Sequence, residues 1–348
     1  MSIARLFGIE IPIVQAPMAG VQAGALAAAV CEAGALGSLP CALLSTEGMV
    51  RELELVRSRT GRPYNVNFFC HAAPAADAAR EAQWRSELAP HYRELGIDAA
   101  SIPAGPGRAP FTSAAADALE PFRPAVVSFH FGLPGPALVT RVKAWGSKVI
   151  GCATTVEEAQ WLEAHGVDAV IAQGVEAGGH RGNFLTADLT TQAGTFALLP
   201  QVVRAVKVPV IAAGGIADAD GVAAAMALGA AGVQVGTAFL LCPEATTSAV
   251  HRAALKGPAA RHTALTNVFT GRPARGIVNR VMREHGPISA KAPEFPLATA
   301  AIAPLRAKAE AQGSGDFSPL WSGQNATGCR EVPAAELVRG LAARLVHA

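Results

Sequence analysis

The sequence predicts an α/β fold, a (β/α)8 TIM barrel with an inserted, mainly helical cap after the eighth strand. The length of 348 residues suits a barrel of about 250 residues that carries an insertion. Apolar residues make up 51% of the chain and charged residues 16%, which is typical of a compact protein with a large core. Short apolar runs alternate with helix-compatible stretches, and this alternation indicates a parallel sheet that closes into a barrel.

The predicted strands are runs of apolar and β-branched residues. They lie at residues 11–18, 35–40, 64–70, 125–131, 148–154, 168–174, 208–215 and 232–240. Helix signals fall between them, such as the acidic first turn of TVEEAQWLEAHG. The run at 222–243 lacks charge for long enough to suggest a membrane span, but its pattern changes from helical to strand-like at Gly232. We therefore expect a buried helix and a buried strand there, with no membrane contact.

Beyond residue 240 the alternation stops. Residues 241–325 contain helical pieces between Gly and Pro turns, with no strand signal, and VPAAELVRGLAARLVHA then predicts a final helix. We predict a barrel over residues 1–240, a helical substrate cap over 241–325 and a C-terminal helix over 326–348 that closes the barrel. A second long detour, residues 71–124, has no assignment.

Composition and the cysteine pattern limit the classes of partner and ligand that we expect for the chain. The 29 Lys and Arg are scattered and the net charge is +2, so we expect no nucleic-acid partner. The six cysteines show no C-x-x-C motif, and neither Cys70 nor His71 has further ligands at a recognisable spacing, so no metal site is expected. No charged-then-apolar leader is visible, which favours a reduced, cytoplasmic protein. The sequence leaves the oligomeric state open.

Functional residues of such barrels lie after the carboxyl ends of the strands. Glycine-rich loops follow the seventh and eighth predicted strands, in AAGGIADADG and QVGTAF. Backbone N–H groups at these two positions usually hold the phosphate of a barrel ligand. Gly214, Gly215, Gly236 and Thr237 therefore predict a phosphorylated ligand, although the glycines alone also suit tight turns.

The loop QGVEAGGHRG, residues 173–182, follows the sixth predicted strand and sets His180 among glycines. Glycine lets a ligand approach the main chain closely, so we expect a ligand to lie against Gly178 and Gly179. An imidazole titrates near neutrality and can remove a carbon proton or hydrogen-bond an anionic group. His180 is therefore the candidate catalytic residue, and a structural histidine that ties two loops together is the alternative.

Other polar residues receive supporting roles. His130, at the end of the fourth predicted strand, is a candidate substrate contact, with plain packing as the alternative. Glu176 and Arg181 flank His180, and we expect both to be solvated and to stabilise the loop. Arg272 and Arg275 are expected to brace the cap.

The motifs QAPMAG, NVNFFCH, SFHFGLP, QGVEAGGHRG, AAGGIADADG, GVQVGTAFLLCPEA and TGRPARGIVN resemble the nitronate monooxygenases over nearly the whole chain. These are FMN-dependent barrels with an inserted substrate domain. EAGGHRG, AAGGI and QVGT are shared with FMN-dependent enoyl-acyl carrier protein reductases, whereas NFFCH and SFHFG favour the nitronate group. The resemblance implies FMN as cofactor and His180 as the catalytic histidine. It implies flavin contacts at Asn67, Gln173, Gly178, Gly215, Gln234, Val235, Gly236 and Thr237.

The residue types agree with a flavin site. Amides such as Asn67 and Gln173 donate and accept at once, which suits the edge of an isoalloxazine ring, and turn capping is their alternative role. Pro17 and Met18 would give the ring an apolar floor. The chain has only two tyrosines, Tyr64 and Tyr92, and neither lies in FPLATAAIAPLRAKAE, where relatives carry tyrosines and a lysine. We therefore expect a differently shaped substrate pocket.

The leading hypothesis is an FMN-dependent monooxygenase that oxidises alkyl nitronates with O2 to carbonyl compounds and nitrite. Neutral nitroalkanes are candidate second substrates. In this reading the cofactor carries the redox chemistry and the protein orients the small-molecule substrate. The alternative enzyme is an NAD(P)H-dependent FMN reductase of quinones or enoyl thioesters, and a non-catalytic flavin-binding barrel is the third hypothesis.

Overall fold

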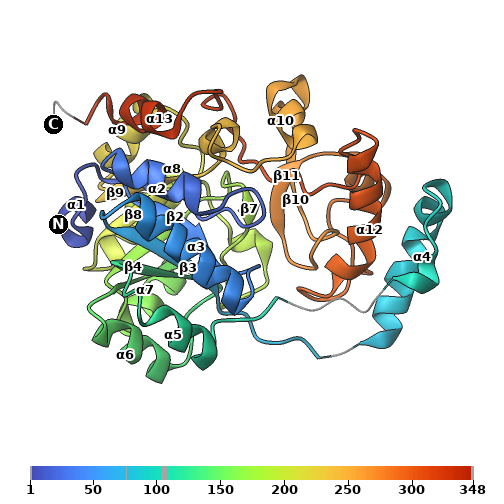
Figure 1. Cartoon of the computed structure of the whole chain (residues 1–348), viewed down its shortest axis with the longest axis horizontal. Coiled ribbons are helices and arrows are strands. Elements are labelled where there is room, and N and C mark those ends of the chain that lie inside the picture. Colours follow the sequence, from blue (N-terminus) through green and yellow to red (C-terminus); the bar gives the residue numbers. More distant parts are fainter. Residues whose placement is uncertain (1, 76, 103–107, 346–348) are drawn as a thin grey trace.

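The computed structural model describes residues 2–75, 77–102 and 108–345. In Figure 1 the barrel and its helices occupy the left of the molecule, and the cap, with β10, β11, α12 and α4, occupies the right. The first and last described helices of the chain, α1 (Ile3–Phe7) and α13 (Ala334–Ala342), both lie on the barrel side (Figure 1).

Eight parallel strands form the barrel, in the order β1-β9-β8-β6-β5-β4-β3-β2. They are β1 Ile13–Gln15, β2 Gly37–Pro40, β3 Tyr64–Phe69, β4 Val126–His130, β5 Lys148–Ala153, β6 Ala169–Gln173, β8 Val210–Ala213 and β9 Gly232–Val235. β1 and β2 close the ring, because the Gln15 N–H donates to the Leu36 carbonyl at 2.9 Å and the Leu36 N–H donates to the Ile13 carbonyl at 2.9 Å. All eight predicted strands are thereby confirmed.

Helices surround the strands; α1 precedes the first strand, and the others alternate with the strands along the chain. They are α1 Ile3–Phe7, α2 Gly24–Glu32, α3 Thr46–Arg59, α5 Ser113–Leu119, α6 Pro136–Ala144, α7 Val156–Ala164, α8 Thr195–Ala205, α9 Ala219–Ala227 and α13 Ala334–Ala342. Side-chain caps fix several starts; Thr155, for example, accepts from the Glu158 N–H at the first turn of α7. α13 packs against α2 and α9 on the outside of the barrel, and its role in closing the barrel stays a prediction.

The uncharged run at 222–243 forms most of α9 and then β9, as the change of pattern predicted. In the described part of the chain, no helix combines the length and hydropathy that a membrane crossing requires.

The cap contains strands as well as helices, so the expectation of no strand in residues 241–325 is wrong. β10 Thr263–Thr266 and β11 Ala274–Ile277 pair antiparallel, and β11 also pairs with β7 Gly179–His180 from the loop after β6. The other elements of this region are η3 Thr237–Leu241, α10 Ala249–Lys256, η4 Pro258–Arg261, α11 Arg280–Glu284 and α12 Ala298–Ala311. The strands β10 and β11 read TALT and ARGI, which lack the continuous apolar runs by which the barrel strands were identified, so local patterning did not reveal them.

The unassigned detour at 71–124 supplies α4 Ala78–Glu94 and η1 Ala99–Ser101, and α4 belongs to the cap. α4 packs on α12, and the buried Tyr92 hydroxyl donates to the Ala301 carbonyl at 2.6 Å. Trp84 and Leu88 of α4 share one hydrophobic core with Leu305 of α12, separate from the main barrel core. The boundaries at residues 240 and 325 stay a prediction, to which the structure adds α4 as a cap element.

Candidate active site

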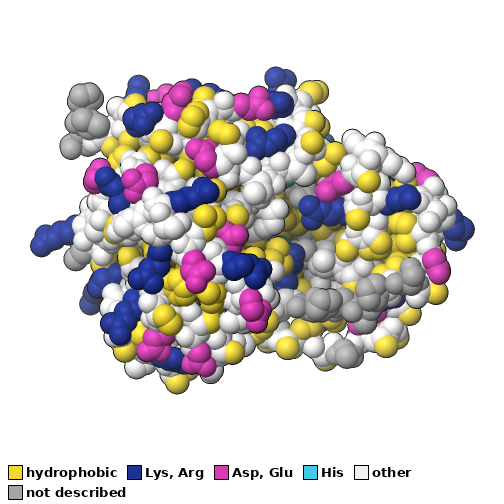
Figure 2. All heavy atoms as spheres, in the orientation of Figure 1, with side chains coloured by type: hydrophobic (Ala, Val, Ile, Leu, Met, Phe, Trp, Pro, Cys, Tyr) yellow, Lys and Arg dark blue, Asp and Glu magenta, His cyan; other side chains and the backbone are white. Residues whose placement is uncertain are grey.

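A cavity opens at the carboxyl ends of the barrel strands, and the surface is hollowed between the barrel and the cap (Figure 2). All but one of the predicted site residues line it. They are Pro17, Met18, Asn67, His130, Gln173, Gly178, Gly179, His180, Gly214, Gly215, Gln234, Gly236 and Thr237. Val235 is the exception, because its side chain is buried in the barrel core.

The predicted phosphate loops contribute glycines of two kinds. Gly214 and Gly215 have φ angles of +114° and +74°, which disfavour any other residue. Gly236 has a φ of −114°, which any residue adopts. A Cβ at Gly236 would lie 3.3 Å from the Ala16 Cβ, at the edge of what packing allows. The backbone therefore favours glycine at 214 and 215, whereas at 236 the close approach of Ala16 and whatever enters the cavity limit the side chain.

Some of the amide side chains at the cavity are fully used in hydrogen bonds within the protein, and others have an atom without a partner. Gln173 uses both ends on the following loop, because its Nε2 donates to the His180 carbonyl at 3.1 Å and its Oε1 accepts from the Gly182 N–H at 2.8 Å. Asn67 donates from Nδ2 to the Ser128 hydroxyl at 2.9 Å. The Oε1 atom of Gln234 is buried without a hydrogen-bond partner. Gln234 is thus the amide that a ligand N–H would satisfy.

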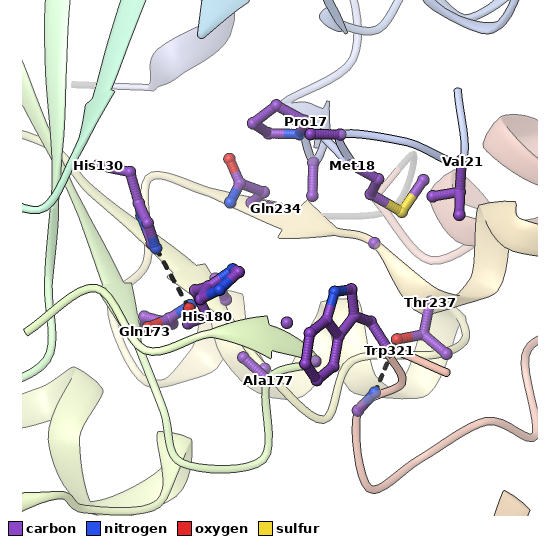
Figure 3. A pocket seen from close by; sticks show the side chains of 18 of the residues that line it. Pro17, Met18, Val21, His130, Gln173, Ala177, His180, Gln234, Thr237 and Trp321 are labelled. Carbon is purple, nitrogen blue, oxygen red and sulfur yellow. Dashed lines mark hydrogen bonds between the residues drawn. The ribbon is translucent and has the colours of Figure 1, made fainter. Parts of the chain in front are cut away.

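Apolar groups face each other across the cavity. Pro17 and Met18 form one wall, and the indole of Trp321 projects from the other side, near Thr237 and Ala177 (Figure 3). The Gly323 N–H donates to the Thr237 hydroxyl at 2.9 Å, which fixes the Trp321 segment over the β9 loop. Sequence reasoning missed Trp321, because nothing near it in the chain marks it as part of a barrel site.

His180 lies on β7, where barrel and cap meet. The backbone of His180 pairs with Ala274 of β11 in an antiparallel ladder, and its side-chain Nε2 lies 2.9 Å from the Thr270 hydroxyl. Its ring packs edge-on against Phe295, with centroids 5.4 Å apart. Its carbonyl accepts from His130 Nε2 at 3.2 Å (Figure 3), so His130 lines the cavity and also holds the histidine strand.

Both cavity histidines are neutral near pH 7. Burial lowers the pKa of His180 well below its usual value of 6.5, and the nearby Arg108, His130 and Arg272 lower it further. Burial lowers the pKa of His130 to about 3. The neutral imidazole of His180 can accept a proton, but its lowered pKa makes it a weaker base than a free histidine.

Two arginines place positive charge at the cavity. Arg108 lines it; its guanidinium lies 5.3 Å from the Phe295 ring, and its Nη1 is buried without a partner. Burial lowers the pKa of Arg108 to about 10, which still leaves it charged at neutral pH. The guanidinium of Arg272 lies 4.0 Å from the Phe131 ring centroid, and its Nη2 donates to the Asn183 carbonyl. Arg108 escaped the sequence reading because it lies in the unassigned detour.

Charged residues near His180 stabilise its loop through hydrogen bonds, and one of them is buried from solvent. Arg181 is fully buried, so the expectation of solvation is wrong for it. Its guanidinium donates to the Gly174 carbonyl at 2.7 Å and to the Gln173 carbonyl at 2.8 Å. Glu176 accepts from the Thr195 N–H instead of pairing with Arg181. Arg275 donates from Nε to the Val175 carbonyl at 2.8 Å and ties the cap to this loop, as expected of a bracing residue.

Comparisons of the sequence and of the fold with known proteins point to the same family. The family model described as nitronate monooxygenase matches residues 2–344. A nitronate monooxygenase from Pseudomonas aeruginosa is 46% identical over 98% of both chains. The crystal structure of a nitroalkane oxidase from Streptomyces ansochromogenes superposes with a TM-score of 0.91 at 41% identity, covering 99% of this chain and 98% of that one. FabK from Thermotoga maritima is more distant, with a TM-score of 0.73 at 28% identity over 98% and 94% of the two chains. The chain therefore belongs to the nitronate monooxygenase family of flavoenzymes.

Proposed function

We propose that the chain binds FMN in this cavity and oxidises alkyl nitronates with O2 to carbonyl compounds and nitrite. Family membership supports the reaction. One observation supports the location of this site. A single cavity is lined by the glycine loops after β8 and β9, by the side-chain amide of Gln234, whose Oε1 has no hydrogen-bond partner, and by the neutral His180.

The residues present fit FMN. The backbone at Gly214, Gly215 and Gly236 would hold its single phosphate, since glycine backbone at strand ends is the usual phosphate cradle of barrels. Gln234 Oε1 would accept from a ring N–H, and Pro17 and Met18 would support the ring. When bound, the flavin supplies the electron acceptor and the reactivity with oxygen.

His180 would receive the carbon proton of a neutral nitroalkane. The Thr270 hydroxyl lies 3.3 Å from the Arg272 carbonyl and can donate to it. The Thr270 oxygen then accepts from the Nε2–H of His180, which leaves the lone pair on Nδ1. A nitronate has already lost this proton, so His180 would only orient it.

Charge favours an anionic substrate. Among the described residues that line the cavity, none is Asp or Glu, whereas Arg108 is present with an unpartnered buried N–H. A nitronate carries its negative charge on two oxygens, and a guanidinium donates to such a pair of oxygens well. Arg108 is therefore our candidate for binding the nitronate group.

The test is anaerobic mixing of the purified, flavin-loaded protein with ethyl nitronate and, separately, with NADPH or NADH. We expect the nitronate to reduce the flavin rapidly, followed by nitrite release when O2 is admitted. Rapid bleaching by a nicotinamide with none by the nitronate would overturn the proposal and favour the reductase alternative, which the likeness to FabK keeps as the second candidate. Reduction by neither would indicate a non-catalytic flavin-binding barrel.

A further inference from the structure

A second cluster of potential ligands lies in the cap, where α4 meets the end of α11. The Nε2 of His91 lies 2.9 Å from the Nε2 of His285 and 3.3 Å from the Oε2 of Glu284. All three atoms lie within 4.8 Å of one another. None of the three residues lines the catalytic cavity.

We propose that His91, Glu284 and His285 bind a divalent ion of the zinc type. Two imidazole nitrogens and one carboxylate oxygen are a donor set that Zn²⁺ uses, at bond lengths of about 2.0–2.2 Å. Such bonds in a tetrahedron separate neighbouring ligand atoms by about 3.3 Å. The two contacts of His91, at 2.9 and 3.3 Å, need little adjustment to reach this spacing. Glu284 is exposed, so water can complete the coordination.

The surroundings orient the ligands. The Oε1 of Glu284 accepts from Arg280 Nε at 2.7 Å, which leaves Oε2 for the ion. Arg280 also donates to both oxygens of Glu94, so two carboxylates offset its one positive charge. His91 is buried and its Nδ1 has no hydrogen-bond partner, with the Oε2 of Glu94 4.0 Å away. A metal-bound histidine usually donates its other ring N–H to a carboxylate, and the Oε2 of Glu94 would need to approach from 4.0 Å to accept from His91 Nδ1.

The site would join two separate parts of the chain. His91 and His285 are 194 residues apart, so no ligand spacing in the sequence could mark them, which is why the sequence predicted no metal. An ion bound here links α4, from the detour at 71–124, to α11 of the cap. Because the unfolded chain does not hold these ligands together, binding would stabilise the folded cap.

The experiment uses flavin-loaded, tag-free protein, treated with chelator and titrated with Zn²⁺ by calorimetry, and with Co²⁺ by visible absorption beyond the flavin bands. We expect one Zn²⁺ per chain, a tetrahedral Co²⁺ spectrum and a rise in Tm with Zn²⁺. His285→Gln and Glu284→Gln should each weaken binding by more than about 100-fold, since loss of an outer partner alone costs about 10- to 100-fold.

The matched control is His262→Gln, which removes an exposed cap histidine outside the cluster and should leave binding unchanged. Neither His285 nor Glu284 is buried, so both variants are expected to fold, and retained flavin checks this. Substoichiometric binding, or binding that both cluster variants retain, overturns the proposal. The cluster would then be only a hydrogen-bonded contact between helices.

Discussion

The barrel and the cap are built in different ways from one chain. In the barrel, each strand and the helix after it are close in sequence, and their apolar faces meet in one core that contains residues such as Leu162. In the cap, α4 and α12 lie about 200 residues apart in sequence yet share a core that contains Trp84 and Leu305. The glycine loops of the barrel line the cavity in which we propose that the cofactor binds, and Arg108 and Trp321 reach the same cavity from segments outside the βα repeat.

The largest expected effect concerns His180, on the strand where barrel and cap meet. A positioned general base contributes about 10²- to 10⁴-fold, so His180→Asn should lower turnover of nitroethane by roughly that factor. Turnover of ethyl nitronate should fall by less than about tenfold, because no proton is removed. Steady-state assays of both substrates measure this, with His165→Asn, an exposed change at the C-cap of α7, as control. Equal losses on both substrates would assign His180 to binding, and no loss to structure.

The second test separates the two cores. Leu305 of the cap and Leu162 of the barrel are both fully buried, and truncation of either to Ala should cost about 2–5 kcal/mol of stability. Thermal melts followed by circular dichroism and by flavin fluorescence should differ between the variants. We expect Leu162→Ala to lower the temperature of flavin release strongly and Leu305→Ala to lower it less. Identical shifts in both signals would show that cap and barrel unfold as one unit.

The third test concerns the barrel loop that we propose to hold the phosphate of the cofactor. Gly236→Val adds a side chain where the φ angle allows one, so weaker flavin retention would report crowding at the cavity, by the ligand or by Ala16, and not backbone strain. Overpacking costs about 1–3 kcal/mol, which corresponds to roughly 5- to 150-fold in flavin affinity. Gly61→Val, at a position with open space around it, is the matched control. Full flavin occupancy in purified Gly236→Val would exclude Gly236 from the phosphate site.

Arg108 tests the contribution of the detour at 71–124 to substrate recognition. A hydrogen bond to a charged group is worth at least about 1.5 kcal/mol, so Arg108→Gln should raise the KM for ethyl nitronate roughly tenfold. Its kcat and its KM for neutral nitroethane should change little, and Arg108→Lys should restore part of the loss. Arg93→Gln, an exposed change on α4, serves as control. An equal rise of KM for both substrates would show that the charge of Arg108 does not select the anion.

The smallest expected effect is a pH dependence of stability. Burial lowers the pKa of His130 in the barrel to about 3 and of His251 in the cap region to about 4. The unfolded chain, with histidine pKa values near 6.5, binds more protons below that pH, so stability is present above pH 6.5 and is lost on acidification. Each histidine contributes at most about 1.4 kcal/mol per pH unit. Urea unfolding between pH 7 and 5 should show this slope, and His251→Gln should reduce it; an unchanged slope would contradict the assignment to His251.

The candidate site was largely predictable from sequence because its parts follow strand ends. Gln173 is the last residue of β6, Gly215 follows β8, and Gln234 lies one residue before the end of β9, and parallel strands bring such positions to one edge. Val235 shows the limit of carrying a motif over as a block, because its side chain alternates into the core. Arg181 shows a second limit of prediction from sequence. Its charge suggested exposure to solvent, whereas three hydrogen bonds hold its guanidinium in the interior.

The sequence alone determined the barrel, its eight strands, the glycine loops and the place of His180, because these depend on residues that are neighbours in the chain. Only the tertiary structure decided the cap: the pairing of β7 with β11, the packing of α4 on α12, and the approach of Arg108 and Trp321 to the cavity. These contacts join segments that are distant in sequence and too short or irregular to form alone. Their stability comes from burial against one another, and the order of residues along the chain does not display it.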